Sequence, residues 1–254
     1  MRKLSILAVM AATSLFATPA MSAVTYNLSS DFSNINNPNG VWSFTQGATA
    51  LAHYSIPITP NALNVAAANG YWGTGPGFNT APFVIRTTSN GSAAVGYDNN
   101  AFLTGDVILH STNPGNGADL FVNWTAPASG IIDVFGSVWY AHTPVDRSND
   151  VVLTLGATNL ITTTLTNAIT RSNAFGFSNL GLTVAAGQVI SFRFKPTVGQ
   201  QFGSVAGLNE TVIFTANAAG AVPEPATWGM MLLGFGLVGS AMRRRDATRV
   251  RALA

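Results

Sequence analysis

Cysteine is absent from this chain of 254 residues, which excludes disulfide bonds, zinc–thiolate sites and thiol nucleophiles. Charged residues are scarce as well, because they make up 9% of the sequence against roughly one quarter in ordinary soluble domains. Hydrophobic residues make up 47%, which is ample for a core. The polar surface must therefore come from Asn, Thr, Ser and Gly, a composition typical of exported β-proteins.

Most of the basic residues lie at the two ends of the chain, although the formal net charge is +2. Between Val24 and Val222 there are five basic residues against eight acidic ones, a net charge of −3. A mildly acidic body is a poor partner for a polyanion, so we expect it not to bind nucleic acid.

The first 23 residues, MRKLSILAVMAATSLFATPAMSA, combine a basic start, an apolar stretch and a run of small residues. This order is typical of a secretory signal peptide and predicts export through the secretion machinery, with signal peptidase cutting after Ala23 or, as the next candidate, after Ala20. The alternative is an uncleaved membrane anchor. The apolar stretch is short for that role, since a spanning helix needs about 20 residues.

An uncharged apolar run covers residues 226–242 and is followed directly by Arg243, Arg244 and Arg245. This length is at the lower limit for crossing a bilayer and would also suit a buried helix. A basic cluster directly after the run favours a transmembrane helix whose end stays in the cytoplasm, with the body outside the inner membrane. The G-x-G-x-x-G pattern at 234–239 lacks the preceding strand of a dinucleotide site, so we interpret its glycines as helix-packing residues.

Pro223 and Pro225 flank Glu224 just before this run. Each proline disfavours helical geometry in the residue before it, so Glu224 is predicted to be extended and exposed, as a protease substrate must be. These three residues, then Trp228 with its neighbouring methionines, the apolar run and the three arginines closely resemble the PEP-CTERM sorting signal. The resemblance implies export, removal of the tail by an exosortase, which is a membrane protease-transpeptidase, and association with exopolysaccharide and biofilm matrix.

Short alternating runs bounded by Gly, Asn and Pro dominate the body, and no helical period is sustained there. This pattern predicts an all-β antiparallel sandwich. The predicted organisation is a signal peptide over 1–23, a β-sandwich ectodomain over 24–216, a linker over 217–222 and a sorting signal over 223–254, with the PEP motif at 223–225, the membrane helix at 226–242 and the basic tail at 243–254.

Four segments of the body carry more specific expectations. Residues 129–140 predict a strand with one buried and one partly wet face. Residues 151–165 predict a hairpin with a four-residue turn, and residues 182–194 predict a second hairpin. Residues 69–77 predict an exposed loop.

The order of several short landmarks also resembles a jelly-roll domain common in PEP-CTERM proteins. The resemblance implies an ectodomain associated with carbohydrate. The landmarks are NPNGVW at 37–42, the strand into His110, NWTAPASG at 123–130 and AAGQVISF at 185–192.

Catalytic residues are not found in the sequence. Glycoside hydrolysis needs two carboxylates held roughly 5 to 10 Å apart, and the one close pair of acids, Asp146 and Asp150, lies in a polar loop. We interpret this loop as solvent-exposed. The alternative is a calcium site that uses Asp146, Asn149 and Asp150. We therefore expect no catalysis and no cofactor other than this candidate calcium.

Aromatic side chains are the remaining candidates for binding, because sugar sites combine flat aromatic faces with short polar groups. Tyr71, Trp72 and Trp139 are the candidate glycan contacts, although a tryptophan on a strand also suits a core. We expect a matrix protein that binds or scaffolds exopolysaccharide. A self-assembling structural protein is the alternative, and a secreted hydrolase is the third possibility.

Overall fold

The computed structural model describes residues 22–55, 70–76, 80–91, 101–142, 145–217 and 225–251. Its strands lie in one compact unit, Ser22–Asn217, and the helix α1 (Pro225–Arg251) belongs to a second unit. The predicted signal peptide up to residue 21, the linker from residue 218, Pro223 and Glu224 all lie outside the described residues.

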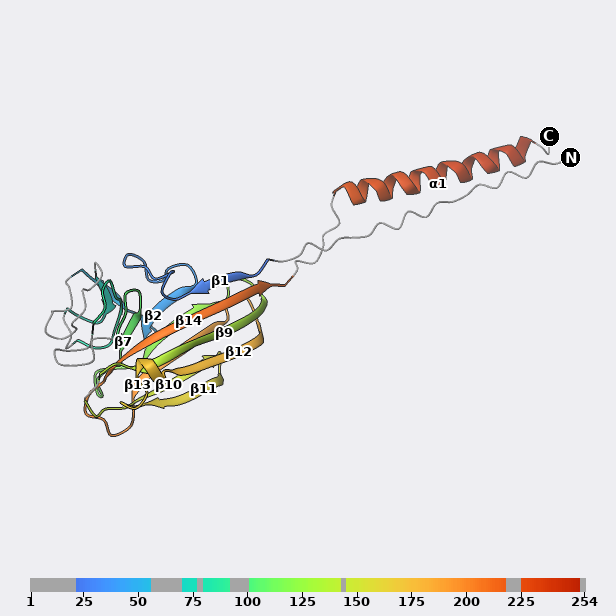
Figure 1. Ribbon diagram of the computed structural model, residues 1–254. Helices are drawn as coiled ribbons and strands as arrows, with labels where there is room; N and C mark the ends of the chain where they lie inside the picture. The colour runs from blue at the N-terminus through green and yellow to red at the C-terminus, as the bar shows by residue number, and fades with distance from the viewer. Residues whose placement is uncertain are drawn as a thin grey trace. The chain divides into compact units, whose positions relative to one another are not determined.

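Two antiparallel sheets form the compact unit, as the alternating pattern predicts (Figure 1). The first sheet has the order β12 (Phe175–Val184), β9 (Gly130–Tyr140), β14 (Val205–Ala216), β7 (Val107–His110), β6 (Phe83–Arg86), β5 (Tyr71–Gly73) and β4 (Ala52–Tyr54), with β1 (Val24–Asn27) paired to β14. The second sheet has the order β11 (Thr158–Leu165), β10 (Asn149–Leu155), β13 (Val189–Pro196), β8 (Leu120–Thr125), β2 (Trp42–Gln46) and β3 (Thr49–Ala50). A short 3-10 helix, η1 (Arg171–Asn173), lies between β11 and β12.

Alternation along the strands sets which side chains enter the core. In β9, Val134 and Val138 are fully buried, whereas Asp133 and Ser137 on the other face are partly exposed. In β13, Phe192 is buried between two partly exposed neighbours. Both patterns follow from the two-residue period of a strand and confirm the predicted faces.

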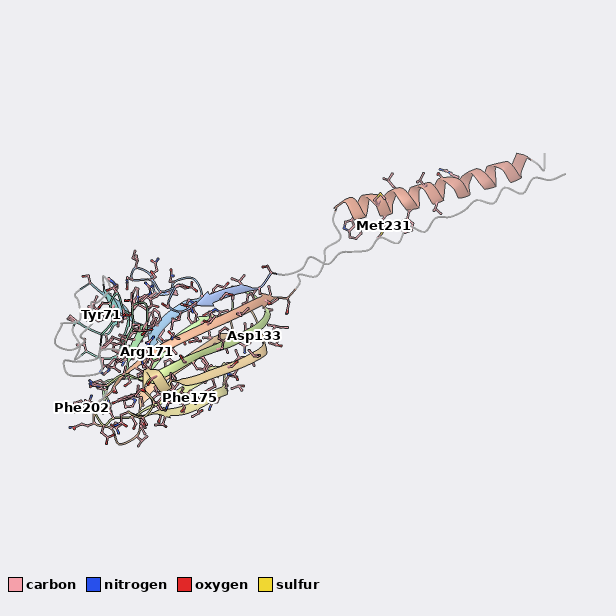
Figure 2. The ribbon with its side chains drawn as sticks, viewed as in Figure 1. Tyr71, Asp133, Arg171, Phe175, Phe202 and Met231 are labelled. Atoms are coloured by element: carbon pink, nitrogen blue, oxygen red, sulfur yellow. The ribbon has the colours of Figure 1, made fainter. Side chains whose placement is uncertain are left out.

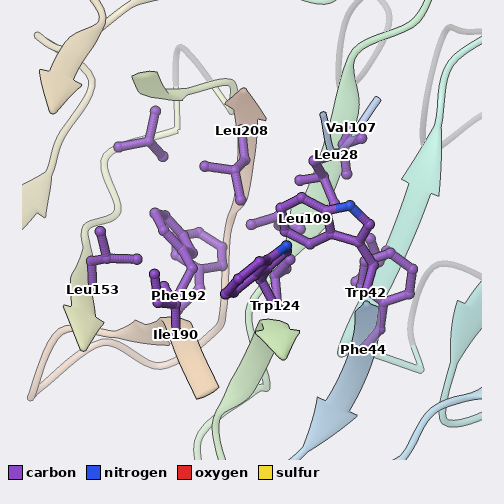
Figure 3. Close-up of a cluster of buried hydrophobic side chains, with 14 of the residues drawn as sticks. Leu28, Trp42, Phe44, Val107, Leu109, Trp124, Leu153, Ile190, Phe192 and Leu208 are labelled. Carbon is purple, nitrogen blue, oxygen red and sulfur yellow. The ribbon is translucent and has the colours of Figure 1, made fainter. Parts of the chain in front are cut away.

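The main core lies between the two sheets and draws side chains from both. The indoles of Trp42 and Trp124 pack there with aliphatic residues such as Leu109 and Leu208 (Figure 3). Each large apolar side chain buried in this way contributes roughly 1.5 to 3 kcal/mol to folding. The core supplies the stability that a protein without disulfides cannot draw from crosslinks.

A second buried cluster includes Trp139, Tyr71, Phe83 and Ile108. Trp139 follows the core residue Val138 on β9, so it points to the opposite face of the sheet. The sheet is therefore covered on both faces at this end. Two of the three predicted glycan contacts, Tyr71 and Trp139, are therefore buried in this second cluster.

The two predicted hairpins have different outcomes. β10 and β11 do pair as a hairpin, but Leu155 pairs with Thr158, so the turn is the two residues Gly156 and Ala157 instead of four. The predicted second hairpin is wrong, since β12 pairs with β9 in one sheet and β13 pairs with β10 and β8 in the other. The turn near Gly187 crosses between sheets, because both strands bury one face against the same core.

Candidate functional site

The predicted glycan contacts are buried, so that prediction is wrong as stated. Tyr71, Trp72 and Trp139 expose 0%, 4% and 1% of their surface. The Tyr71 hydroxyl donates to the carbonyl of Gly75 at 2.8 Å, and Trp139 Nε1 donates to the carbonyl of Ala101 at 2.8 Å. Segments distant in sequence cover these aromatics, and the polar neighbours of residues 69–77 do not reveal that cover.

The three predicted calcium ligands do not converge. Asn149 and Asp150 are neighbours on β10, so their side chains point to opposite faces of the strand. Asn149 is buried and accepts a hydrogen bond from Ser111 Oγ at 2.7 Å, while Asp150 accepts from Thr164 and Thr197. Among the described residues no group of three or more His or acidic side chains could hold a metal ion.

A groove runs beside β1 and β2, formed by two adjoining hollows that share Asp31 and Asn39. We call it the Asp31 groove. Its hollows have volumes of about 630 and 340 Å³, in the range of small-molecule sites. The larger is also lined by Ser30, Phe32, Ser33, Asn34, Ile35 and His53. The smaller is also lined by Thr25, Tyr26, Gly40, Val41 and Trp42.

The Asp31 carboxylate holds the groove together where the two hollows meet. Its Oδ2 accepts the backbone N–H of Asn27 at 2.8 Å and Trp42 Nε1 at 3.2 Å. The Asn39 amide donates to the Asp31 carbonyl at 2.9 Å. Because charged acceptors make the stronger hydrogen bonds, Asp31 fixes the loop to β1 and β2.

The wall of the larger hollow rests on Trp72. The indole Nε1 donates to the carbonyl of Ser33 at 2.7 Å, and the exposed His53 ring packs edge-on against Trp72 at 5.2 Å between centroids. Trp72 is thus a support behind the groove, where the sequence predicted a ligand contact. Asn37 adds a second brace, since its side chain bonds the backbones of both Phe44 and Leu51.

The lining of the Asp31 groove suits binding better than proton transfer. Hydroxyl and amide groups alternate with the partly exposed aromatics Tyr26 and Phe32. The one carboxylate in the lining, Asp31, already accepts several hydrogen bonds. Short polar groups beside aromatic surface match the hydroxyls and C–H faces of a sugar. No motif marks this site in the sequence, because its parts come from β1, the loop after it, β2 and β4.

A buried polar network joins the loops after β7 and β9. His142 Nδ1 lies 3.0 Å from Ser204 Oγ, and the backbone N–H of Ser204 donates to Ser111 Oγ at 2.9 Å. Burial lowers the pKa of both His110 and His142 to about 4, so both rings are neutral at pH 7. Ser204 is completely buried, so this serine–histidine pair ties strands together and does not face a substrate.

The sorting segment is helical from Pro225 to Arg251, and Trp228 and Arg243 are exposed on it. Large apolar side chains on α1 are also exposed, such as Met231 at 50% (Figure 2). In the part of the chain that the structure describes, no helix is both long and apolar enough to cross a membrane. The segment predicted as a span, residues 226–242, lies within α1.

Comparison with known proteins identifies the C-terminal segment. Residues 221–245 match the PEP-CTERM protein-sorting motif, as the resemblance of Pro223, Glu224, Pro225 and the arginine cluster predicts. No curated protein matches the chain.

Solved structures with likeness to this chain are β-domains of low identity. The CBM36-1 domain of a multidomain xylanase from the hindgut metagenome of Trinervitermes trinervoides is 18% identical, with a TM-score of 0.29, over 54% of this chain and 99% of that domain. CsCBM6-3 from Clostridium stercorarium, solved with cellobiose, is 13% identical, with a TM-score of 0.24, over 44% and 75%. The K3 adhesin domain of Lys-gingipain from Porphyromonas gingivalis is 13% identical, with a TM-score of 0.32, over 76% and 99%.

Proposed function

Because residues 221–245 carry a PEP-CTERM protein-sorting motif, we propose that the chain is exported, held briefly at the inner membrane by its C-terminal segment and released by an exosortase. The mature β-sandwich then resides in the cell envelope or extracellular matrix. There it binds exopolysaccharide through the Asp31 groove without catalysing a reaction.

The observation that carries the binding proposal is the lining of the Asp31 groove. It presents hydroxyl and amide groups beside aromatic surface on a loop that Asp31 and Trp72 hold in place. A site organised before binding spends little free energy on ordering its loops. No second carboxylate lines the described groove, which favours binding over glycoside hydrolysis.

Filling the larger hollow is expected to weaken binding strongly. Ser30 lines it and is exposed, so Ser30→Trp places an indole where the sugar would lie. Ser178→Trp is the matched control, because Ser178 is an exposed serine on β12 outside the groove. We expect affinity for matrix polysaccharide to fall at least about tenfold in the first variant, the equivalent of roughly 1.4 kcal/mol. Equal binding by both variants, measured by calorimetry, would place the ligand elsewhere.

Processing is tested separately at the motif. Replacing Glu224 and both flanking prolines with alanine removes the residues by which the segment resembles an exosortase substrate. We expect the variant to accumulate at full length in the membrane fraction of the producing cell, while the unchanged chain loses its tail. Intact-mass measurement distinguishes the two forms. Equal trimming of both would show that the tail is removed without this motif.

A further inference from the structure

The described edges of the two sheets differ in how open they are to another strand. β3 and β4 have two and three residues, and β1 has four. β12 is long, but it contains Gly176 and Gly181, and its pairing is interrupted between Asn179 and Leu182, where Gly181 has a φ of 69°. Short strands and irregular pairing are the usual means by which a protein keeps a sheet edge from pairing with other chains.

β11 has one such irregularity, at Leu160, and pairs regularly with β10 over residues 161–165, which contain no glycine. It is eight residues long, pairs only with β10, and forms the outer strand of its sheet (Figure 1). Five of its residues are β-branched, four of them threonines. The stretch Val151–Thr170 contains no charged residue and no proline. The stretch 161–165 is a regular, uncharged and mostly β-branched edge, which is the sequence and geometry that a second strand adds to.

From this contrast we infer that the β11 edge is an interface with a second copy of the same chain, formed by antiparallel β11–β11 pairing. Two identical antiparallel strands related by a two-fold axis satisfy each other's N–H and C=O groups reciprocally. The edge carries no charge that would select a charged partner, and an identical strand brings none that would be repelled. The pairing joins two six-stranded sheets into one.

The threonine side chains favour a specific contact over non-specific association. Thr162 and Thr164 are exposed, while Leu160 and Ile161 lean against the main core. Thr164 Oγ1 donates to Asp150 Oδ1 at 2.9 Å, which fixes one end of the strand to β10. The edge therefore offers hydrogen-bonding backbone between polar side chains. This interface is separate from the Asp31 groove and does not depend on sugar binding.

The test is the concentration dependence of association of the full chain, without polysaccharide, in a mild detergent that covers the apolar side chains of α1. Sedimentation velocity is expected to show a monomer–dimer equilibrium, and hydrogen exchange of the β11 amides is expected to slow as the dimer forms. Thr162→Lys/Thr164→Lys places like charges across the two-fold axis and is expected to weaken dimerisation about tenfold. Ser178→Lys/Thr183→Lys, at two exposed hydroxyl residues on β12, the edge strand of the other sheet, is the matched control and is expected to leave dimerisation within about twofold.

Thr162→Lys alone keeps the hydrogen bond between Thr164 and Asp150. This single variant replaces the double variant in the test if circular dichroism shows that the double variant is unfolded. An association unchanged by both the double and the single β11 variant would overturn the inference. A chain that stays monomeric at every concentration, or a β12 variant that weakens association as much as the β11 variant, would do so as well. Since no sugar is present, none of these results bears on the proposed glycan site.

Discussion

Glu210→Gln is expected to stabilise the β-sandwich at alkaline pH. Glu210 lies on β14 between the core residues Leu208 and Val212, and it is 1% exposed. Its Oε2 is buried without a hydrogen-bond partner in the described part of the protein, and it sits opposite Gly136. Burial raises the pKa of Glu210 from 4.5 to about 8, because ionisation would leave an unpaired charge in the core.

The sign of the effect follows from proton counting. Between pH 4.5 and about 8 the folded protein holds a proton on Glu210 that the unfolded chain has released, so the free energy of unfolding falls as pH rises. The loss over this interval is at most about 5 kcal/mol. The glutamine variant has no such proton and removes this slope. A variant whose unfolding free energy declines with pH in parallel with the unchanged protein would show that Glu210 ionises freely.

His110 and His142 act in the opposite direction at lower pH. Their pKa values are lowered from 6.5 to about 4 by burial, so between these values the unfolded chain binds protons that the folded protein excludes. Stability therefore rises with pH up to about 6.5. Together with Glu210 they predict a maximum near pH 6.5, and Glu210→Gln is expected to flatten the alkaline side of the curve and to steepen the rise between pH 4.5 and 6.5. Urea unfolding at a series of pH values measures both sides.

Gly207→Ala is expected to destabilise the sandwich by about 3 kcal/mol, or roughly 10 °C in Tm. Gly207 on β14 pairs with Trp139 on β9, and a methyl group at Gly207 would fall within the Trp139 indole. The indole has little freedom to move, since its Nε1 bonds the carbonyl of Ala101 and the Arg171 guanidinium lies 4.6 Å from its ring centroid. Arg171 is held in turn by an ion pair with Asp106.

The control for this clash is Gly176→Ala on β12. A methyl group there meets only the carbonyl of Gly136, at 4.0 Å, so stability is expected to change by no more than about 0.5 kcal/mol. Adding Trp139→Phe to Gly207→Ala shortens the ring and is expected to recover part of the loss. Thermal unfolding followed by tryptophan fluorescence reads both effects. An unchanged Tm for Gly207→Ala would contradict this prediction, because it would mean that the Trp139 indole adopts another position at no cost in stability.

The strands that sequence reasoning predicted well are those whose pattern is local. The alternation through Val134 and Val138 on β9, and through Phe192 on β13, fixes both strand and buried face. The same alternation cannot say which sheet a strand joins, so β12 and β13 were predicted as partners although they lie in different sheets. Membership of a sheet depends on pairings with β9 and β8 that are distant in sequence.

The functional residues were harder to predict for the same reason. Tyr71 and Trp72 are flanked by glycines and polar residues, which is typical of a loop, yet other segments cover them. Asp31 bonds Trp42, and Trp72 bonds Ser33 across 39 residues of chain, so no spacing rule marks the groove. The sorting motif could be predicted in full, because motif, helix and arginines follow one another directly in the chain.

Binding to the producing cell's own exopolysaccharide tests the central claim most directly. The Ser22–Asn217 unit contains both hydrophobic clusters and is the part to titrate. The account predicts saturable binding that Ser30→Trp weakens at least about tenfold and Ser178→Trp preserves. Absence of binding by the unchanged unit, at polysaccharide concentrations where a known glycan-binding domain saturates, would contradict it.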